Sequence, residues 1–261
     1  MKLAVSNIAW TAEQDEEVYA KMRELGFIGL EIAPTRTLPE RPYERCKEAI
    51  AWREQIATHY GFEVPSMQSI WYGRTESIFG TPEERTVLLE YTKHAIEFAE
   101  AVGCKNLVFG CPKNRVLPEN ANAEIAVPFF RELGDYACSH GAVIGLEANP
   151  PVYQTNFMNT TEQALDWIAR IDSPGICLNL DLGTMLYGNE PAALLEGRVD
   201  KVSHVHISEP MLAPVKSRPL HREIAKVLLQ QNYDGFVSIE MGRTDDLDNI
   251  LAAMEDISSR F

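Results

Sequence analysis

The sequence predicts an α/β protein that folds as one (β/α)8 barrel across residues 1–261. Short apolar runs alternate with longer amphipathic segments, a pattern typical of parallel βαβ units. There are eight such units with no stretch left for a second domain, and the length of 261 residues suits a barrel, which commonly has about 250. The alternative, an open doubly wound sheet, usually has a glycine-rich turn after its first strand, and Ser6–Trp10 is not such a turn.

Eight short apolar runs are expected to form the strands of the barrel. They are Leu3–Ile8, Ile28–Ile32, Glu63–Gln68, Asn106–Phe109, Val143–Ala148, Ile176–Leu182, Val202–Ile207 and Phe236–Met241. The helices are expected at Glu13–Leu25, Tyr43–Tyr60, Pro82–Val102, Asn122–His140, Thr161–Ile171, Pro191–Glu196, His221–Gln231 and Asp245–Ser258. Helix signals support these boundaries, since Thr81 and Pro82 form a cap and a first helical position, and Gly103 follows a helix end.

The connections differ in length according to their direction. Those from helix to strand are short, such as Gly26-Phe27 and Gly61-Phe62, whereas several from strand to helix are long, such as Ser69–Thr81 and Gly110–Ala121. In a parallel barrel all strand-to-helix loops emerge at the carboxyl ends of the strands, where barrel enzymes have their active sites. The sequence therefore predicts a functional site on that face.

The charge and the cysteines exclude several classes of partner. A net charge of −14 without a Lys/Arg-rich run would repel polyanions, so no nucleic-acid partner is expected. The five cysteines form no CxxC pair, which is typical of reduced thiols in a cytoplasmic protein. No run approaches 18 apolar residues and the N-terminus lacks a signal-peptide pattern, so we expect a cytoplasmic protein without a membrane partner.

Side-chain alternation in the later strands brings four ionisable residues to the carboxyl end of the barrel. In each strand the apolar face must pack on the helices, so the polar face points into the barrel. Carboxylates gathered there would repel each other, and a cation would remove that repulsion. Three carboxylates and one imidazole favour Mn²⁺, with Mg²⁺ or Co²⁺ as alternatives and zinc less suited. The four residues are Glu147, Asp181, His206 and Glu240.

The motifs that carry these residues resemble the xylose-isomerase-like TIM barrel superfamily. The resembling segments are Gly145–Asn149, Asn179–Asp181, His204–Glu209 and Ser238–Glu240. The superfamily includes sugar phosphate isomerases and epimerases, ketose 3-epimerases, hydroxypyruvate isomerase, inosose dehydratase and a metal-dependent endonuclease. The resemblance implies that the four residues are metal ligands and that Glu147 and Glu240 are also an acid/base pair. It also suggests a homo-oligomer, a dimer or a tetramer, by analogy alone.

The sequence departs from the relatives at three expected substrate positions. Ketose 3-epimerases usually have a histidine shortly after the strand 6 aspartate, where Thr184 stands here, and an arginine after the strand 7 histidine, for which Arg218 is a loose match. Many relatives end strand 3 with a histidine, and here Gln68 ends it. The endonuclease branch needs three metals and further ligands that this sequence lacks.

Further residues near the strand ends are candidates for substrate contact. His204 should lie one layer below His206 and donate a hydrogen bond beneath the site, while Glu31 would bind substrate hydroxyls or pair with an arginine. The other candidates are Trp71, Asn149, Glu209 and His221. The loop cations Arg74, Lys113, Arg115 and Arg218 are expected to be solvated, and no glycine-rich phosphate cradle follows strands 7 or 8, so no phosphorylated substrate is predicted.

These observations favour an enzyme, a divalent-metal-dependent isomerase or epimerase of a free carbohydrate that moves a proton next to a metal-bound carbonyl through an enediolate. A dehydratase or carbon–glycoside lyase acting on a keto-sugar or inosose is the second reading, and a non-catalytic sugar-binding barrel is the third. The pair Glu147 and Glu240 weighs against the third, because binding alone does not need two bases.

Overall fold

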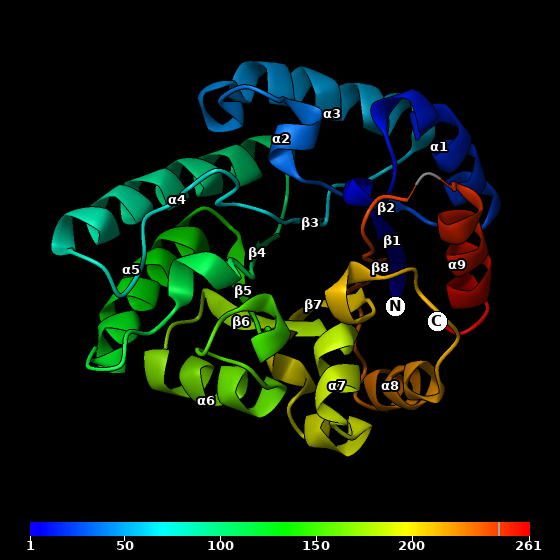
Figure 1. Cartoon of the computed structure of the whole chain (residues 1–261). Helices are drawn as coiled ribbons and strands as arrows, with labels where there is room; N and C mark the ends of the chain where they lie inside the picture. The colour runs from blue at the N-terminus through cyan, green and yellow to red at the C-terminus, as the bar shows by residue number, and fades with distance from the viewer. Residues whose placement is uncertain (245) are drawn as a thin grey trace.

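The computed structural model describes residues 1–244 and 246–261, and it confirms the (β/α)8 barrel. Its strands run parallel in one sheet of eight, in the order β2-β1-β8-β7-β6-β5-β4-β3, and the helices form a ring around them (Figure 1). The strands are β1 Lys2–Ser6, β2 Gly29–Glu31, β3 Ser66–Met67, β4 Asn106–Phe109, β5 Val143–Glu147, β6 Ile176–Asp181, β7 Val202–Ile207 and β8 Phe236–Ile239.

The barrel closes between β2 and β3 through a small number of contacts. Bridges join Gly29 to Glu63 and Ile32 to Met67. Leu30 N donates to Glu63 O at 2.9 Å, and Gln68 N donates to Ile32 O at 2.9 Å. The expected strand Glu63–Gln68 is thus shorter than predicted, with only two residues in regular strand, but its backbone still completes the cylinder.

Seven of the eight predicted helices are present, with differences at their ends. The helices of the described residues are α1 Asp15–Glu24, α2 Pro34–Thr37, α3 Cys46–Tyr60, α4 Pro82–Val102, α5 Ala126–Ser139, α6 Thr161–Ile171, α7 Leu182–Gly188, α8 Pro219–Gln230 and α9 Asp248–Ser258, of which α2 and α7 were not predicted. The predicted cap of α4 forms, because Glu84 N donates to Thr81 Oγ1 at 3.3 Å and Thr81 N donates to Glu84 Oε2 at 2.7 Å. The expected start of the last helix, Asp245, lies outside the described residues.

Two predictions around β6 are wrong. The strand was expected to reach Leu182, but it ends at Asp181, and Leu182 begins α7. Asp181 stops the strand because its Oδ1 accepts a hydrogen bond from Thr184 N at 2.6 Å, which caps the new helix. The helix expected at Pro191–Glu196 is only a single 3-10 turn, Ala192–Leu195, so α7 is the helix of this unit.

The floor of the barrel is a polar layer. Asn106 Nδ2 donates to Ser66 Oγ at 3.0 Å and to Asn179 Oδ1 at 3.3 Å, and Ser203 Oγ donates to Asn106 Oδ1 at 2.8 Å. Gly145 leaves room for this network, since a Cβ there would lie 2.7 Å from Asn106 Oδ1. These hydrogen bonds join β3, β4, β6 and β7 inside the barrel, below the carboxyl ends of the strands where the predicted site lies.

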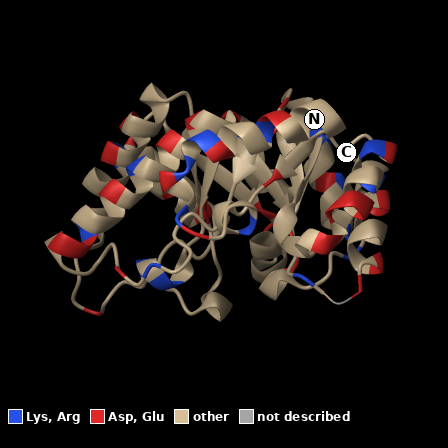
Figure 2. Ribbon diagram, turned by 90° about the horizontal axis from the view of Figure 1, so that it is seen from above, with Lys and Arg blue, Asp and Glu red and all other residues tan. Residues whose placement is uncertain are grey.

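The outer surface carries charges of both signs. Acidic and basic residues are intermixed along the outer helices (Figure 2). Several pair between helices, such as Lys21 with Glu255 at 2.7 Å and Lys93 with Glu132 at 3.0 Å. Within residues 1–244 and 246–261, no helix has the length and apolar character that crossing a bilayer requires.

Candidate metal centre

The four predicted ligands come together at the carboxyl ends of four adjacent strands. Glu147 and Asp181 are the last residues of β5 and β6, His206 lies near the end of β7, and Glu240 directly follows β8. The register pairs Asp181 with His206, so their side chains share one level of the barrel. Each of the four can offer one ligand atom, and these atoms all lie within 4.8 Å of one another.

His206 is at the centre of the cluster. Its Nδ1 is 3.0 Å from Glu147 Oε1 and 3.2 Å from Glu240 Oε2. Asn179 Nδ2 donates to the same Glu147 oxygen at 2.8 Å, and Asn149 Nδ2 donates to the other at 3.1 Å. Both oxygens of Glu147 are therefore held by side chains with fixed positions.

The electrostatics of the cluster indicate a site with excess negative charge. Burial, reinforced by the carboxylates of Glu147 and Glu240, raises the pKa of Asp181 to about 7. Burial also raises the pKa of Glu240. For His206, burial alone would lower the pKa, but the carboxylates of Glu240 and Glu31 outweigh it and hold that pKa well above its usual value. Three carboxylates and one imidazole fit a hard divalent cation, which would neutralise this charge.

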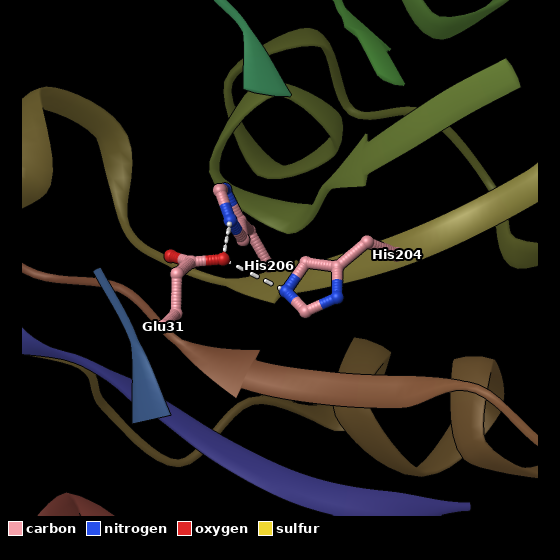
Figure 3. Close-up of side chains that lie close together, drawn as sticks. All are labelled: Glu31, His204 and His206. Atoms are coloured by element: carbon pink, nitrogen blue, oxygen red, sulfur yellow. Dashed lines mark hydrogen bonds and ion pairs between the residues drawn. The ribbon is translucent and has the colours of Figure 1, made fainter. Parts of the chain in front are cut away.

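A second group of ionisable side chains, Glu31, His204 and His206, shares His206 with the first group (Figure 3). Glu31 Oε2 is 3.0 Å from His206 Nε2 and 2.8 Å from His204 Nε2, although His204 does not point along a regular hydrogen bond. Burial would raise the pKa of Glu31, but the two histidines outweigh it and hold that pKa well below the usual value. Burial lowers the pKa of His204. The expected pairing of Glu31 with an arginine is wrong, because its carboxylate faces the two imidazoles.

A cavity of about 230 Å³ opens above the carboxylates. Its described lining contains no lysine, arginine or histidine. The lining residues are Gln68, Ser69, Val108, Gly110, Cys111, Pro112, Glu147, Asn149, Tyr153, Asp181, Leu212 and Glu240. A larger hollow of about 970 Å³ lies at the opposite end of the barrel and contains none of the four clustered residues, so the smaller cavity is the one that belongs to the site.

The candidate substrate contacts divide into two groups. Gln68 and Asn149 line the cavity. Trp71 does not, because it is buried, donates from Nε1 to Thr92 Oγ1 at 2.8 Å and packs edge-on against Phe109. Thr184 donates from Oγ1 to Ala148 O at 2.7 Å and thereby joins α7 to the end of β5.

The remaining candidates lie outside the cavity lining as well. Glu209 and Arg218 form a two-pronged ion pair, with Arg218 Nε and Nη2 each 2.7 Å from a carboxylate oxygen. His221 is fully buried, and neither of its ring nitrogens has a hydrogen-bond partner among the described residues. Burial lowers the pKa of His221 to about 4.

Ser208 and Gly110 support the cluster and were not anticipated. Ser208 donates to Asp181 Oδ2 and accepts from Gly183 N at 2.8 Å, so it holds the carboxylate that also caps α7. A Cβ at Gly110 would lie 2.8 Å from Glu147 Oε2. Strand parity could have indicated Ser208, which follows His206 by two residues, whereas nothing in the sequence pattern marks Gly110.

Arg115 corrects the expectation that the loop cations are solvated, because its side chain is fully buried. Nη1 donates to the backbone carbonyl of Glu147 at 2.8 Å, and Nη2 donates to Asn149 Oδ1 at 2.8 Å. Burial lowers the pKa of Arg115 to about 10. The guanidinium thus lies behind the cavity wall and contacts the residues that hold Glu147.

Comparisons with known proteins agree with this architecture. The sequence model of the xylose isomerase-like TIM barrel family matches residues 19–259. No curated protein matches the chain in sequence. The solved structures that resemble it do so over almost the whole chain at low identity.

Three of these structures illustrate the range of proteins that share this fold. The 3-keto-D-glucoside 4-epimerase of E. coli is 22% identical, with a TM-score of 0.73 and coverage of 99% of each chain. The D-psicose 3-epimerase of Clostridium cellulolyticum H10 is 18% identical, with a TM-score of 0.74 and coverage of 99% of this chain and 92% of that one. A family 2 AP endonuclease of Brucella melitensis is 18% identical, with a TM-score of 0.75 and coverage of 98% of each. At these low sequence identities, the structural similarity shows that the proteins share a fold and nothing more.

Proposed function

The chain belongs to the xylose isomerase-like TIM barrel family, and we propose that it is a divalent-metal-dependent isomerase or epimerase of an uncharged keto-sugar. One observation carries the proposal: Glu147 and Glu240 approach the same imidazole nitrogen of His206, at 3.0 and 3.2 Å, at the base of a cavity. Two carboxylates and one cation site in one small cavity are the elements that proton transfer next to a carbonyl requires.

Glu147, Asp181, His206 and Glu240 would hold the cation, and the donor set favours Mn²⁺. A divalent ion there would act as a Lewis acid on a carbonyl and the neighbouring hydroxyl, which acidifies the adjacent C–H and stabilises the resulting enediolate. The four ligand atoms come from consecutive strands of a rigid sheet, so little reorganisation would accompany binding.

Glu147 and Glu240 would move the proton. They come from β5 and from the end of β8, so they can reach a substrate from different sides of the cavity. One carboxylate removes a proton from carbon, and the other returns a proton to the opposite face, which inverts the centre. Return to the neighbouring carbon would interconvert an aldose and a ketose. Asn149 and Asn179 hold Glu147 in place during the transfer.

The cavity lining favours an uncharged substrate. Among the residues that line it, Val108, Tyr153 and Leu212 offer apolar groups, and Gln68 and Asn149 offer amides. Such a lining suits the C–H faces and hydroxyl groups of a sugar, and it offers no cation for a phosphate or carboxylate. Two structural neighbours are enzymes of this kind, a 3-keto-D-glucoside 4-epimerase and a D-psicose 3-epimerase solved with D-tagatose. The five free cysteines favour the cytoplasm as its compartment.

Incubation of the Mn²⁺-loaded protein in D₂O with ketoses, 3-keto-glycosides and inososes tests the proposal. We expect deuterium to enter a substrate whose carbon skeleton is retained. Loss of water or of an aglycone would instead identify a dehydratase or a lyase, and tight sugar binding without exchange would identify a binding protein.

Variants connect the exchange to the two carboxylates. Glu147→Gln and Glu240→Gln should each reduce exchange by at least about 100-fold, since general acid–base groups contribute about 10² to 10⁴. Glu119→Gln is the matched control, because Glu119 is exposed on a strand-to-helix loop of the same barrel face. Exchange that survives in both test variants would contradict the assignment.

A further inference from the structure

We infer that Glu31 is a positioning residue that keeps the proton of His206 on Nε2, so that Nδ1 presents its lone pair to the cation. The inference rests on the proposed metal site and goes beyond it, since Glu31 neither lines the cavity nor belongs to the four-residue cluster. It replaces the substrate-binding role that the sequence suggested for this glutamate.

The two ring nitrogens of His206 face two different environments. Nδ1 faces Glu147 and Glu240, the side where the cation would bind. Nε2 faces Glu31 Oε2 at 3.0 Å, from below (Figure 3). An ionised carboxylate can only accept a hydrogen bond, so Glu31 requires a proton on Nε2. Glu147 and Glu240 likewise favour a proton on Nδ1 in the metal-free site, and a cation that binds these two carboxylates would take the place of that proton. A neutral imidazole with its proton on Nε2 has its free lone pair on Nδ1.

Glu31 can do this because its own position is fixed. The side chain is fully buried, and its backbone lies at the end of β2, paired with Ser6 of β1. Gln68 Nε2 donates to Ser6 Oγ at 2.8 Å and to Glu31 Oε1 at 3.3 Å. The carboxylate therefore has a neighbour at each oxygen and no route to a substrate in the cavity above.

His204 is a second imidazole in contact with the Glu31 carboxylate. Its Nε2 is 2.8 Å from the same Glu31 oxygen that faces His206, and the two imidazole rings meet edge to face with centroids 5.4 Å apart. Both histidines come from β7, two residues apart, so the strand itself sets their spacing. The carboxylate therefore contacts both imidazoles of this strand, and its contact with Nε2 restrains the His206 ring.

Mn²⁺ titration of the full chain tests the inference without any substrate. Residues that orient a metal-binding histidine typically contribute about 10- to 100-fold in metal affinity, so we expect Glu31→Ala to weaken Mn²⁺ binding by that factor. Glu31→Gln should restore most of it, because the amide oxygen can still accept from Nε2–H. The exposed Glu119→Gln variant should bind like the wild type.

A second readout reports the proton directly. In protein labelled with ¹⁵N-histidine and loaded with diamagnetic Mg²⁺, two-bond ¹⁵N–¹H spectra should show His206 protonated on Nε2 alone. The His206→Gln variant identifies the signal among the six histidines. In the Mg²⁺ form of Glu31→Ala the Nε2–H group should lose its carboxylate acceptor, so the Nε2 and Nε2–H resonances of His206 should shift relative to the wild type, which a merely structural role of Glu31 would not produce.

Three results would overturn the inference. They are wild-type Mn²⁺ affinity in Glu31→Ala, a His206 protonated on Nδ1 in the Mg²⁺ form, and a second bound ion that disappears with either Glu31 or His204. The last would mean that Glu31, His204 and His206 bind a metal themselves. A Mn²⁺-loaded wild type that exchanges no substrate proton would contradict the proposed function alone and leave the role of Glu31 intact.

Discussion

Glu147 and Glu240 differ in the number of groups that hold them. Glu147 accepts from Asn149 and Asn179, while Glu240 has only His206 within hydrogen-bond reach among the described side chains. The support of Glu147 continues outward to Arg115, whose two donors reach the Glu147 carbonyl and Asn149. Arg115 thus influences a proposed catalytic group without touching the cavity.

Substitutions of Arg115 should distinguish the effect of its charge from the effect of its two hydrogen bonds. Arg115→Lys keeps the charge but cannot donate to two acceptors in a fixed fork, so we expect proton exchange to fall by about 10-fold or more while Mn²⁺ affinity stays within a few-fold of wild type. Arg115→Met should in addition lower stability by about 1–3 kcal/mol, because buried acceptors lose their donors.

Exchange rates with a ketose substrate and urea unfolding measure the two effects. Lys113→Met provides the control, since Lys113 lies in the same short helical turn but is exposed. A fully active Arg115→Lys variant would show that only the charge matters, against this prediction.

At the scale of elements, Asp181 serves two functions. It is a proposed metal ligand, and its Oδ1 caps α7 through Thr184 N. Asp181→Asn should keep the cap and lose the charge, so we expect Mn²⁺ affinity to fall by more than about 100-fold, beyond the 10- to 100-fold typical of a supporting residue. Asp181→Ala should also lose the cap, which lowers the free energy of unfolding by about 1 kcal/mol further.

Urea unfolding without metal, together with Mn²⁺ titration, distinguishes the two functions of Asp181. Equal stability of the Asn and Ala variants would mean that the cap contributes little. Undiminished Mn²⁺ binding in Asp181→Asn would remove this residue from the metal site.

The packing of α8 should make stability depend on pH through His221. The ring is buried near its charged neighbours Glu209, Arg218, Asp256 and Arg260, and burial lowers its pKa from 6.5 to about 4. The folded protein therefore disfavours the charged ring, so this contribution to stability is complete above pH 6.5 and is lost as the pH falls toward 4.

His221→Leu should reduce that loss. Between pH 7 and pH 4 we expect the variant to lose less unfolding free energy than the wild type, by about 3 kcal/mol at most. Urea titrations at several pH values measure this difference. Parallel pH profiles for the two proteins would mean that His221 does not titrate as proposed.

The sequence could predict strands and their inward faces but not every boundary. Period-two alternation holds wherever a strand has one packed face, so Glu31, His204 and the four clustered residues were expected to point inward. The end of β6 was not predictable in this way, because Leu182 continues the apolar pattern while the Asp181 cap ends the strand. Arg115 and Trp71 lie in long loops, where tertiary contacts decide burial and local pattern carries little information.

At the scale of the whole molecule, the barrel brings together residues that are far apart in the sequence. Parallel strands bring all their carboxyl ends to one face, so residues from 147 to 240 meet within a few ångströms. The same geometry brings Glu31, which lies 175 positions before His206, to within 3.0 Å of it. The site therefore depends on β2, which joins β7 through β1 and β8, as well as on the strands that carry the ligands.

Binding of a cation should consequently stabilise the whole barrel. An ion that binds only the folded state adds about 2.7 kcal/mol at a free concentration 100 times its Kd, and for a domain of this size that corresponds to an increase of about 5–10 °C in the melting temperature. We expect Mn²⁺ to produce this increase in thermal unfolding scans and EDTA to reverse it. KCl at equal ionic strength is the control, because a chain with a net charge of −14 also gains stability from simple screening. An equal increase in Asp181→Asn, or with KCl alone, would mean that the ion acts on the surface charge and not at the four strand ends.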